Sequence, residues 1–171
     1  MFVVKRCGKK EPVDFVKIER CAIWAAKDLS IDYTEVVNEQ KLREIVYDGI
    51  PTHLIQDVIA NQAVTKITEN WDWTYFASRF LLQKIRKQAN NGSIVYPSLI
   101  DYIKRIKTEC NRKVDDFLSH YNYEFDELQR ALNTDLDFDF SYLALSSLYD
   151  RYLLRNKEGQ VIELPQHFFM R

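Results

Sequence analysis

The chain has 171 residues, enough to bury a core as one domain or as two small ones, and a formal net charge of −1. So balanced a charge argues against sequence-independent binding of nucleic acid through bulk electrostatics. The three cysteines form no CxxC pair, and no apolar run reaches the roughly 18 residues of a membrane-spanning helix. We therefore expect neither a zinc site nor a disulfide framework, and place the protein in the reducing cytoplasm, away from membranes.

The first thirty residues predict a β-hairpin followed by a helix. The segments VVKR and EPVDF flank CGKK, in which Gly8 can adopt the left-handed conformation of a tight turn. Asp14 then stands where it can cap the N-terminus of a helix over residues 15–29, whose apolar residues recur at helical spacing.

Three more helices are predicted before residue 92. The segments EVVNEQKLREIVYDG and LIQDVIANQAVTKIT carry helical apolar stripes, and Thr52 is the expected N-cap of the second of them. The third runs from about Trp73 and ends at the breaker Asn90-Asn91-Gly92. A two-stranded ribbon and four helices make a complete small unit.

The residues after Gly92 predict shorter elements. Helices are expected over PSLIDYIKRIKTEC, KVDDFLSHY and FDELQRALN, and SYLALSSLYDRYLL reads as a helix that runs into a strand. QVIEL is a second strand across the turn NKEG, and PQHFFMR begins a helix that has no end within the sequence. This unfinished pattern suggests a truncated protein.

Several basic residues each allow two interpretations. Lys5 and Arg6 are neighbours on a strand, so their side chains point to opposite faces; they solvate an edge strand or help to hold an anion. Lys84, Arg86 and Lys87 read as a solvated helix end.

Two polar residues of the same region are equally open to interpretation. Thr52 at a helix N-terminus is a plain cap or a phosphate contact. Glu11 either balances Lys10 or accepts hydrogen bonds from a sugar or base.

No local motif points to a catalytic centre or a metal site. The alternating carboxylates of Asp135, Asp137 and Asp139 lack a fourth ligand and EF-hand spacing, so we expect a solvated or capping segment. The chain has no P-loop, GxGxxG or GxSxG pattern. Its three histidines show no ligand or triad spacing; they are His53, His120 and His167.

The order of these segments is itself a signal. VVKRCGKKEPVDFVKI, YDGIPTHLIQDVI and WTYFASRFLLQKIRK, taken in order and spacing, resemble the ATP-cone, a regulatory module at the N-terminus of many ribonucleotide reductases. DFDFSYLALSSLYDRYLLRNKEGQVIELPQHFFMR resembles the stretch after the cone in the large (alpha) subunit of class I ribonucleoside-diphosphate reductase.

The resemblance implies a mainly α fold in two parts. Residues 1–91 would form the ATP-cone, a small β-hairpin capping a four-helix bundle. Residues 92–171 would form the N-terminal helical part of the catalytic subunit, with a β-hairpin leading into an α/β barrel that the chain does not contain.

The resemblance also implies an effector site. The positions that match the family's nucleotide contacts are Val3, Lys5, Arg6, Glu11, Asp14, Lys17, Thr52, Gln56 and Lys87. Gln56 stands where other members carry His or Asp, which implies altered recognition of the base or sugar and weaker discrimination between ATP and dATP. The basic residues among them would then bind the same triphosphate through charge-assisted hydrogen bonds, which are the strong kind.

The function implied is control of deoxyribonucleotide synthesis. ATP or dATP, with Mg²⁺, would act as allosteric effector of a thioredoxin- or glutaredoxin-dependent reductase. Its partners would be the rest of the large subunit, further copies of it, and a radical-generating small subunit. The family's catalytic cysteines lie beyond this chain, so the chain alone should be inactive. The alternatives are a free-standing nucleotide-sensing cone and a helical interaction module without catalysis.

Overall fold

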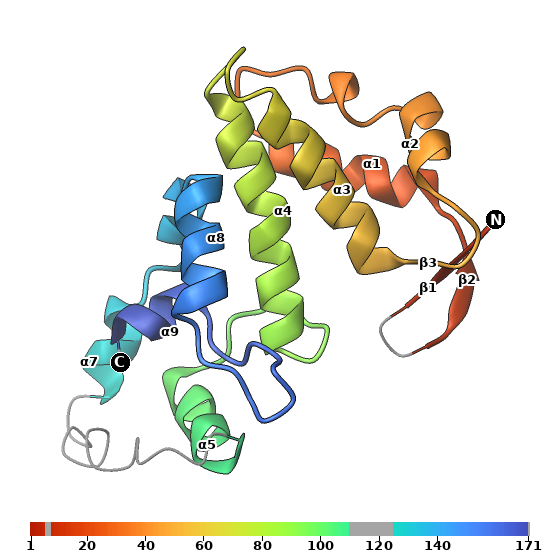
Figure 1. The fold of residues 1–171 in the computed structure, drawn as a ribbon. Helices are drawn as coiled ribbons and strands as arrows, with labels where there is room; N and C mark the ends of the chain where they lie inside the picture. The colour runs from red at the N-terminus through yellow and green to blue at the C-terminus, as the bar shows by residue number, and fades with distance from the viewer. Residues whose placement is uncertain (6–7, 110–124, 171) are drawn as a thin grey trace. The chain divides into compact units, whose positions relative to one another are not determined.

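The computed structural model of the protein describes residues 1–5, 8–109 and 125–170 (Figure 1). Contacts within the chain separate two units. The first comprises Met1–Lys84 with Phe140–Leu145, and the second comprises Ile85–Asp139 with Ser146–Arg171. The predicted domain boundary between residues 91 and 92 stays a prediction.

A small sheet begins the first unit. Strand β1 (Phe2–Val4) pairs antiparallel with β2 (Lys10–Pro12), as the sequence predicts for a hairpin. Gly8 has a φ of 80°, the left-handed conformation expected of it in the turn. A short third strand, β3 (Ile50–Pro51), pairs parallel with the other edge of β1 and was not predicted.

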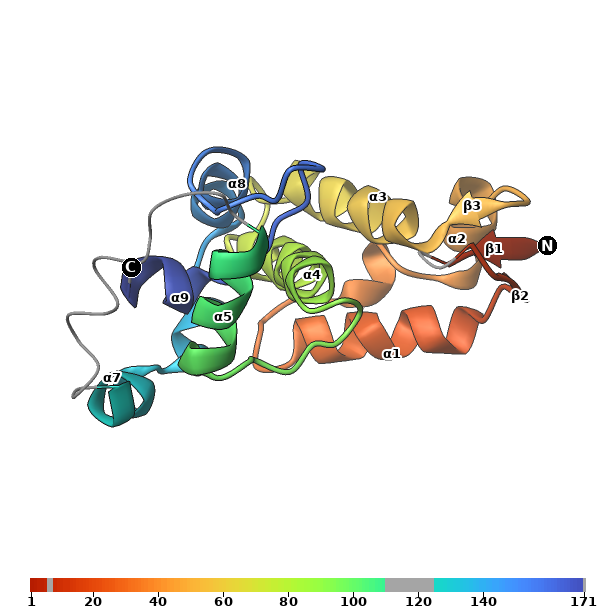
Figure 2. The same cartoon turned by 90° about the horizontal axis from the view of Figure 1, so that it is seen from below.

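Helices account for most of the first unit. These are α1 (Phe15–Ala26), α2 (Glu39–Ile45), α3 (Thr52–Thr65) and α4 (Asp72–Ala89), of which the residues up to Lys84 belong here. Helix α2 is shorter than predicted, because Asn38 caps it by accepting a hydrogen bond from the Lys41 N–H. Figure 2 shows the sheet lying at the end of the unit where α1 and α3 begin.

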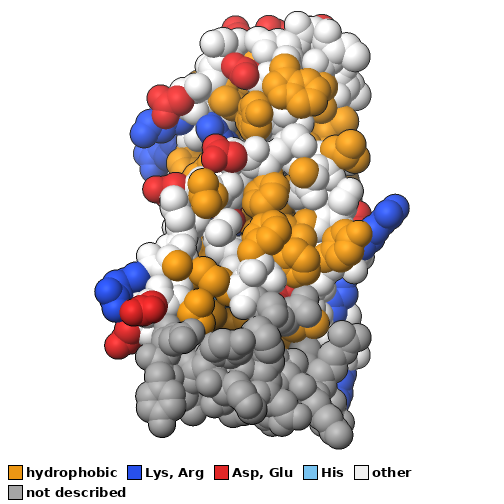
Figure 3. Space-filling view, turned by 90° about the vertical axis from the view of Figure 1, so that its left-hand side faces the viewer, with side chains coloured by type: hydrophobic (Ala, Val, Ile, Leu, Met, Phe, Trp, Pro, Cys, Tyr) orange, Lys and Arg blue, Asp and Glu red, His pale blue; other side chains and the backbone are white. Residues whose placement is uncertain are grey.

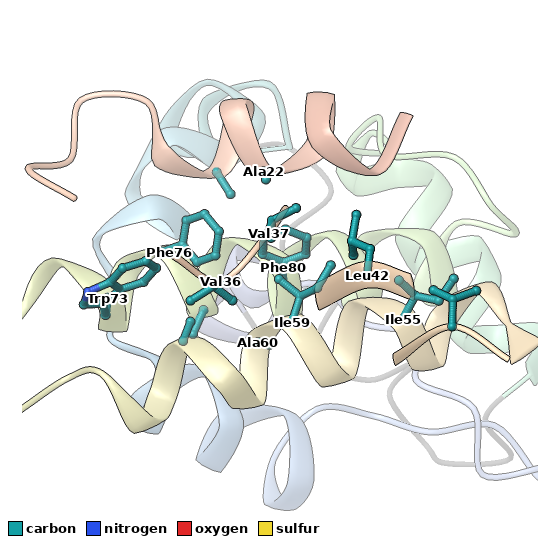
Figure 4. Packing of buried hydrophobic residues seen from close by; sticks show 14 of the residues in the cluster. Ala22, Val36, Val37, Leu42, Ile55, Ile59, Ala60, Trp73, Phe76 and Phe80 are labelled. Carbon is teal, nitrogen blue, oxygen red and sulfur yellow. The ribbon is translucent and has the colours of Figure 1, made fainter. Parts of the chain in front are cut away.

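The core of the first unit lies between these helices (Figure 4). Phe76 on α4 is fully buried and packs edge-on against Trp73 and at a tilt against Phe80, with ring centroids 5.4 and 5.2 Å apart. Aliphatic side chains from the other elements surround this aromatic row, among them Ala22, Val36, Val37, Leu42, Ile55, Ile59 and Ala60. Because these side chains include residues of α1, α2 and α3, this packing fixes α1 and α3 against α4.

The second unit is built from shorter elements. Its helices are α5 (Leu99–Glu109), α7 (Phe125–Ala131) and α9 (Pro165–Met170), together with the end of α8 (Tyr142–Arg151) and a 3-10 helix at Thr134–Asp139. The predicted helix over residues 113–121 lies outside the described residues. The predicted second hairpin forms a single antiparallel bridge between Arg155 and Val161, with Gly159 in its turn.

A buried carboxylate organises the second unit. Asp137 is fully buried and forms an ion pair of 3.0 Å with Arg86. It also accepts hydrogen bonds from the Tyr96 hydroxyl at 2.9 Å and from the Gln166 side-chain amide at 2.9 Å. Asp135 is exposed, as expected for a solvated segment. The same expectation is wrong for Asp137, which is buried and has the partners that a buried carboxylate requires. The prediction that Arg86 belongs to a solvated helix end is also wrong, because Arg86 pairs with this buried carboxylate.

Some apolar side chains remain at the surface. Tyr152 and Phe169 in the second unit are 57% and 60% exposed. Figure 3 shows apolar side chains gathered on one face of the protein. Exposed apolar patches are typical of surfaces that contact another part of a protein or a partner.

Among the described residues, every helix is too short or too polar to cross a bilayer.

His167 lies beside the buried carboxylate network. It is fully buried, stacks on Tyr102 with centroids 4.2 Å apart, and meets the edge of Tyr96 at 5.2 Å. Burial lowers the pKa of His167 to about 4, and the Pro97 backbone, which favours the protonated ring, opposes this only in part. The imidazole is therefore neutral in the folded protein near pH 7.

We predict that this histidine makes the protein sensitive to acid. Its folded pKa lies below the ordinary 6.5, so its contribution to stability is complete above pH 6.5 and is lost as the pH falls towards 4. The free energy of unfolding should fall by about 3 kcal/mol more in the wild type than in His167→Phe over this interval. Denaturant unfolding at both pH values measures the difference, and equal losses in the two proteins would contradict the prediction.

Candidate functional site

The parallel pairing of β1 and β3 creates the geometry of the site. Val3 pairs with Ile50 and Val4 with Pro51. Both strands run in the same direction, and Lys5 and Thr52 are the residues that directly follow the last pair (Figure 1). The strand that ends before Lys5 therefore lies next to the strand that leads into α3.

The first turn of α3 is suited to an anion. The helix begins at Thr52, and its cap position is Pro51, whose side chain cannot accept a hydrogen bond. The prediction that Thr52 is the N-cap is therefore wrong: Pro51 pairs in β3 with extended backbone, and the helix starts directly after it. The first turn carries no acidic residue, so its N–H groups and partial positive charge are left for an external acceptor.

Lys5 is held by an ion pair. Its Nζ lies 2.6 Å from Glu11 Oε2 on the neighbouring strand, and Lys9 Nζ lies 3.3 Å from Glu11 Oε1. The hydrogen bond from Lys5, with a further contribution from Lys9, lowers the pKa of Glu11, which is ionised at neutral pH. Since all three side chains are partly or largely exposed, this arrangement can exchange partners with little loss of free energy.

Asp14 and Lys17 lie at the start of α1. The Asp14 carboxylate accepts a hydrogen bond of 3.0 Å from the Lys17 backbone N–H, which confirms the predicted N-cap. The Lys17 side chain is exposed in the first turn of the helix. The cap uses one oxygen of Asp14 and involves the backbone of Lys17, not its side chain.

Gln56 continues the face of α3 that begins at Thr52. The two residues are four apart, which places them one above the other on the helix. The Gln56 amide nitrogen donates a hydrogen bond of 3.2 Å to the Gln83 side-chain oxygen on α4. The next residues along, Asp57 and Lys84, form an ion pair of 2.8 Å, so Lys84 is not the solvated end that was expected.

The remaining predicted site residues differ in their surroundings. Val3 is 7% exposed, belongs to the core of the first unit and pairs with Glu11 on one side and Ile50 on the other, so its membership of the site stays a prediction. Lys87 lies in the last turn of α4, within the second unit, and its membership of the site stays a prediction. Arg6 lies outside the described residues. Gln83 was missed, because a single glutamine on an amphipathic helix carries no signal until its partner on α3 is known.

Two known protein families match parts of this chain. Residues 1–88 match the family model of the ATP cone domain, and residues 138–171 match that of the ribonucleotide reductase all-alpha domain. The chain belongs to the ATP-cone family, as its sequence predicted. The domain implies that the chain binds a nucleotide effector.

The individual relatives are reductase subunits. The chain is 34% identical over 170 residues to the ribonucleoside-diphosphate reductase subunit alpha of Helicobacter pylori, covering 98% of this chain and 21% of that protein. It is 33% identical to the large chain of Schizosaccharomyces pombe, with 100% and 21% covered, and 30% identical to reductase 1 subunit alpha of Escherichia coli, with 99% and 22% covered. The chain thus spans about a fifth of the length of these relatives.

The cap at Asp14 gives a test of how the start of α1 is held. Replacing Asp14 by Ala removes the acceptor for the Lys17 N–H, and we expect the free energy of unfolding to fall by about 1 kcal/mol. Asp14→Asn keeps an acceptor oxygen and should stay close to the wild type. Equal losses in the two variants, measured by denaturant unfolding, would show that the charge of Asp14 matters and its capping hydrogen bond does not.

Proposed function

We propose that the chain is the N-terminal regulatory portion of a ribonucleoside-diphosphate reductase large subunit, and that it binds ATP or dATP to control overall activity. The observation that carries the proposal is the pairing of the strand before Lys5 with the strand that leads into the uncapped first turn of α3, in a chain whose first 88 residues match the ATP cone.

The triphosphate is the part of the ligand that this arrangement suits best. Lys5, Arg6 and Lys17 would supply the positive charge, and the first-turn N–H groups of α3 with the Thr52 hydroxyl would supply neutral donors. On binding, Lys5 would exchange the Glu11 carboxylate for a phosphate oxygen. Glu11 and Gln56 would then contact the nucleoside, with Val3 packed in the core and Asp14 holding the start of α1.

Magnesium would arrive with the nucleotide. Among the residues that the structure describes, no group of three or more His, Cys, Asp or Glu side chains is placed to hold a metal ion. Mg²⁺ commonly keeps several waters and binds through the phosphates of its substrate. We therefore assign its coordination mainly to the triphosphate, with the protein neutralising the charge that remains.

The wider setting follows from the relatives. The rest of the large subunit would carry the chemistry, and a small subunit would supply the radical, in a thioredoxin- or glutaredoxin-dependent enzyme of the cytoplasm. The exposed Tyr152 and Phe169 suit packing against that remainder. Control by an effector requires ATP and dATP to have different affinities for two assembly states of the large subunit. The match of residues 138–171 to the reductase all-alpha domain favours this function over a free-standing sensor.

Calorimetric titration of the 171-residue chain with Mg-ATP and Mg-dATP tests the proposal. We expect binding of both nucleotides, and we expect Lys5→Ala to weaken it roughly 10- to 100-fold, the loss of one charge-assisted contact. Lys10→Ala is the matched control, because it removes the same charge from an exposed position of the same hairpin and should change affinity by no more than about twofold.

Two outcomes would contradict the proposal. Absence of binding heat and of a thermal shift with either nucleotide would favour the helical interaction module. Equal losses in Lys5→Ala and Lys10→Ala would show that general charge attracts the nucleotide, without the specific contact of Lys5.

A further inference from the structure

The turn before β3 is tied to the start of β1 by two hydrogen bonds. Asp48 Oδ1 accepts a hydrogen bond of 2.7 Å from the Phe2 N–H, and the Phe2 carbonyl accepts one of 2.8 Å from the Gly49 N–H. Both polar groups of the Phe2 backbone are therefore bound by consecutive residues of the turn. Because β1 lies between β2 and β3 in the sheet, this link acts on the β3 side of β1.

The turn is itself held in place at both ends. The Ile50 N–H donates to the Tyr47 carbonyl at 3.2 Å, and Gly49 has a φ of 84°, the left-handed conformation that favours glycine in such a turn. Ile50, which ends the turn, is 2% exposed and belongs to the core of the first unit. The turn thus offers Phe2 a fixed point of attachment.

The strand pairing that this link supports is short. Two residue pairs, Val3 with Ile50 and Val4 with Pro51, join β1 to β3. Pro51 has no backbone N–H and cannot donate to the ladder. Strands paired over so few residues are unstable by themselves. Two further hydrogen bonds at the start of β1 are therefore a large part of what holds these strands together.

Asp48 lies at the other end of β1 from Lys5. Phe2 precedes Lys5 by three residues, which is about 10 Å along an extended strand. The Asp48 carboxylate is thus out of hydrogen-bonding reach of a phosphate bound by Lys5, and its charge repels that phosphate weakly. The α-amino group of Met1 lies 4.0 Å from the same Asp48 oxygen, an exposed contact that contributes little. Support for a ligand from Asp48 therefore passes through the strand.

We propose that Asp48 is a positioning residue of the nucleotide site, which holds the strand that ends before Lys5 against the strand that leads into α3. This inference rests on the proposed nucleotide site. Lys5 and the first turn of α3 follow directly after the two strands, so they bind one triphosphate together while the strands are paired. Because only the paired fraction of molecules is competent to bind, Asp48 raises the affinity without touching the nucleotide.

Calorimetric titration of the 171-residue chain with Mg-ATP measures this effect. In Asp48→Ala the Phe2 N–H loses its acceptor, and we expect the Kd to rise about fivefold, as for the loss of one hydrogen bond. Asp48→Asn removes the charge and keeps an acceptor oxygen, so its Kd should stay within about twofold of the wild type. Tighter binding by both variants would show that Asp48 acts through charge repulsion alone and would overturn the inference.

Asp32→Ala is the matched control for a general loss of stability. The Asp32 carboxylate also accepts a backbone hydrogen bond at an exposed turn of the first unit, from the Thr34 N–H at 3.0 Å. This variant should lower the melting temperature, as Asp48→Ala does, and leave the Kd unchanged. Equal rises of Kd in the two variants would mean that loosening of the unit explains the effect and that the inference is wrong. A rise in Asp48→Asn as large as in Asp48→Ala also overturns it.

Exchange of the Gly49 amide hydrogen with solvent reports on the strand pairing itself. Without nucleotide, this hydrogen should exchange several-fold faster in Asp48→Ala than in the wild type and at the wild-type rate in Asp32→Ala. Saturating Mg-ATP should slow the exchange in both the wild type and Asp48→Ala. A wild-type rate in Asp48→Ala would show that Asp48 does not hold β1, and the inference would be wrong.

The failure of this inference is distinguishable from failure of the proposed function. If the wild type binds Mg-ATP and Asp48→Ala binds it equally tightly, the effector site stands and Asp48 has no part in it. If the wild type binds no nucleotide, the proposed site itself is wrong and the inference falls with it.

Discussion

Strand β1 pairs in parallel with β3 through two residue pairs, Val3 with Ile50 and Val4 with Pro51. This short ladder connects the start of the chain to a segment almost fifty residues later, and Lys5 and α3 follow directly after its two strands. The sheet could not do so alone, because two residues of pairing are weak. The packing of α1 and α3 against the aromatic row of α4 keeps both ends of the ladder in place.

The electrostatics of the two units differ in a way that fits their proposed roles. In the first unit Lys5 and Glu11 are paired at the surface, where an ion pair contributes little and is easily exchanged. In the second unit Arg86 and Asp137 are paired in the interior, with Tyr96 and Gln166 completing the hydrogen bonds of the carboxylate. Removing one partner of such a buried pair is costly, so the second network holds structure and the first is available for a ligand.

The sequence predicted those features that depend on neighbouring residues. The hairpin, the helix over α1 and the Asp14 cap depend on residues only a few positions apart, and they were predicted correctly. Thr52 was misassigned as a cap because the strand pairing of Pro51 comes from β1, far away in the chain. The burial of Asp137 was missed for the same reason, since its partners come from residues 86, 96 and 166.

The candidate site also combines features that neighbouring residues predict with features that depend on distant residues. The cations of the hairpin could be named from the sequence, yet their local pattern fitted a solvated strand edge equally well. The order of three separated segments pointed to the ATP-cone, and the family comparison agrees. The partnership of Gln56 with Gln83 was not accessible to either approach, because it joins two helices through single side chains that no motif marks.

The central claim is that a triphosphate binds where β1 meets the start of α3. Backbone amide chemical shifts of the whole chain, followed by NMR during titration with Mg-ATP, test it most directly. The account predicts that the largest changes fall on residues 3–5, 9–11 and 52–56, with only small changes in α5 and α7. Changes concentrated in α5 and α7, or none at the first turn of α3, would contradict it.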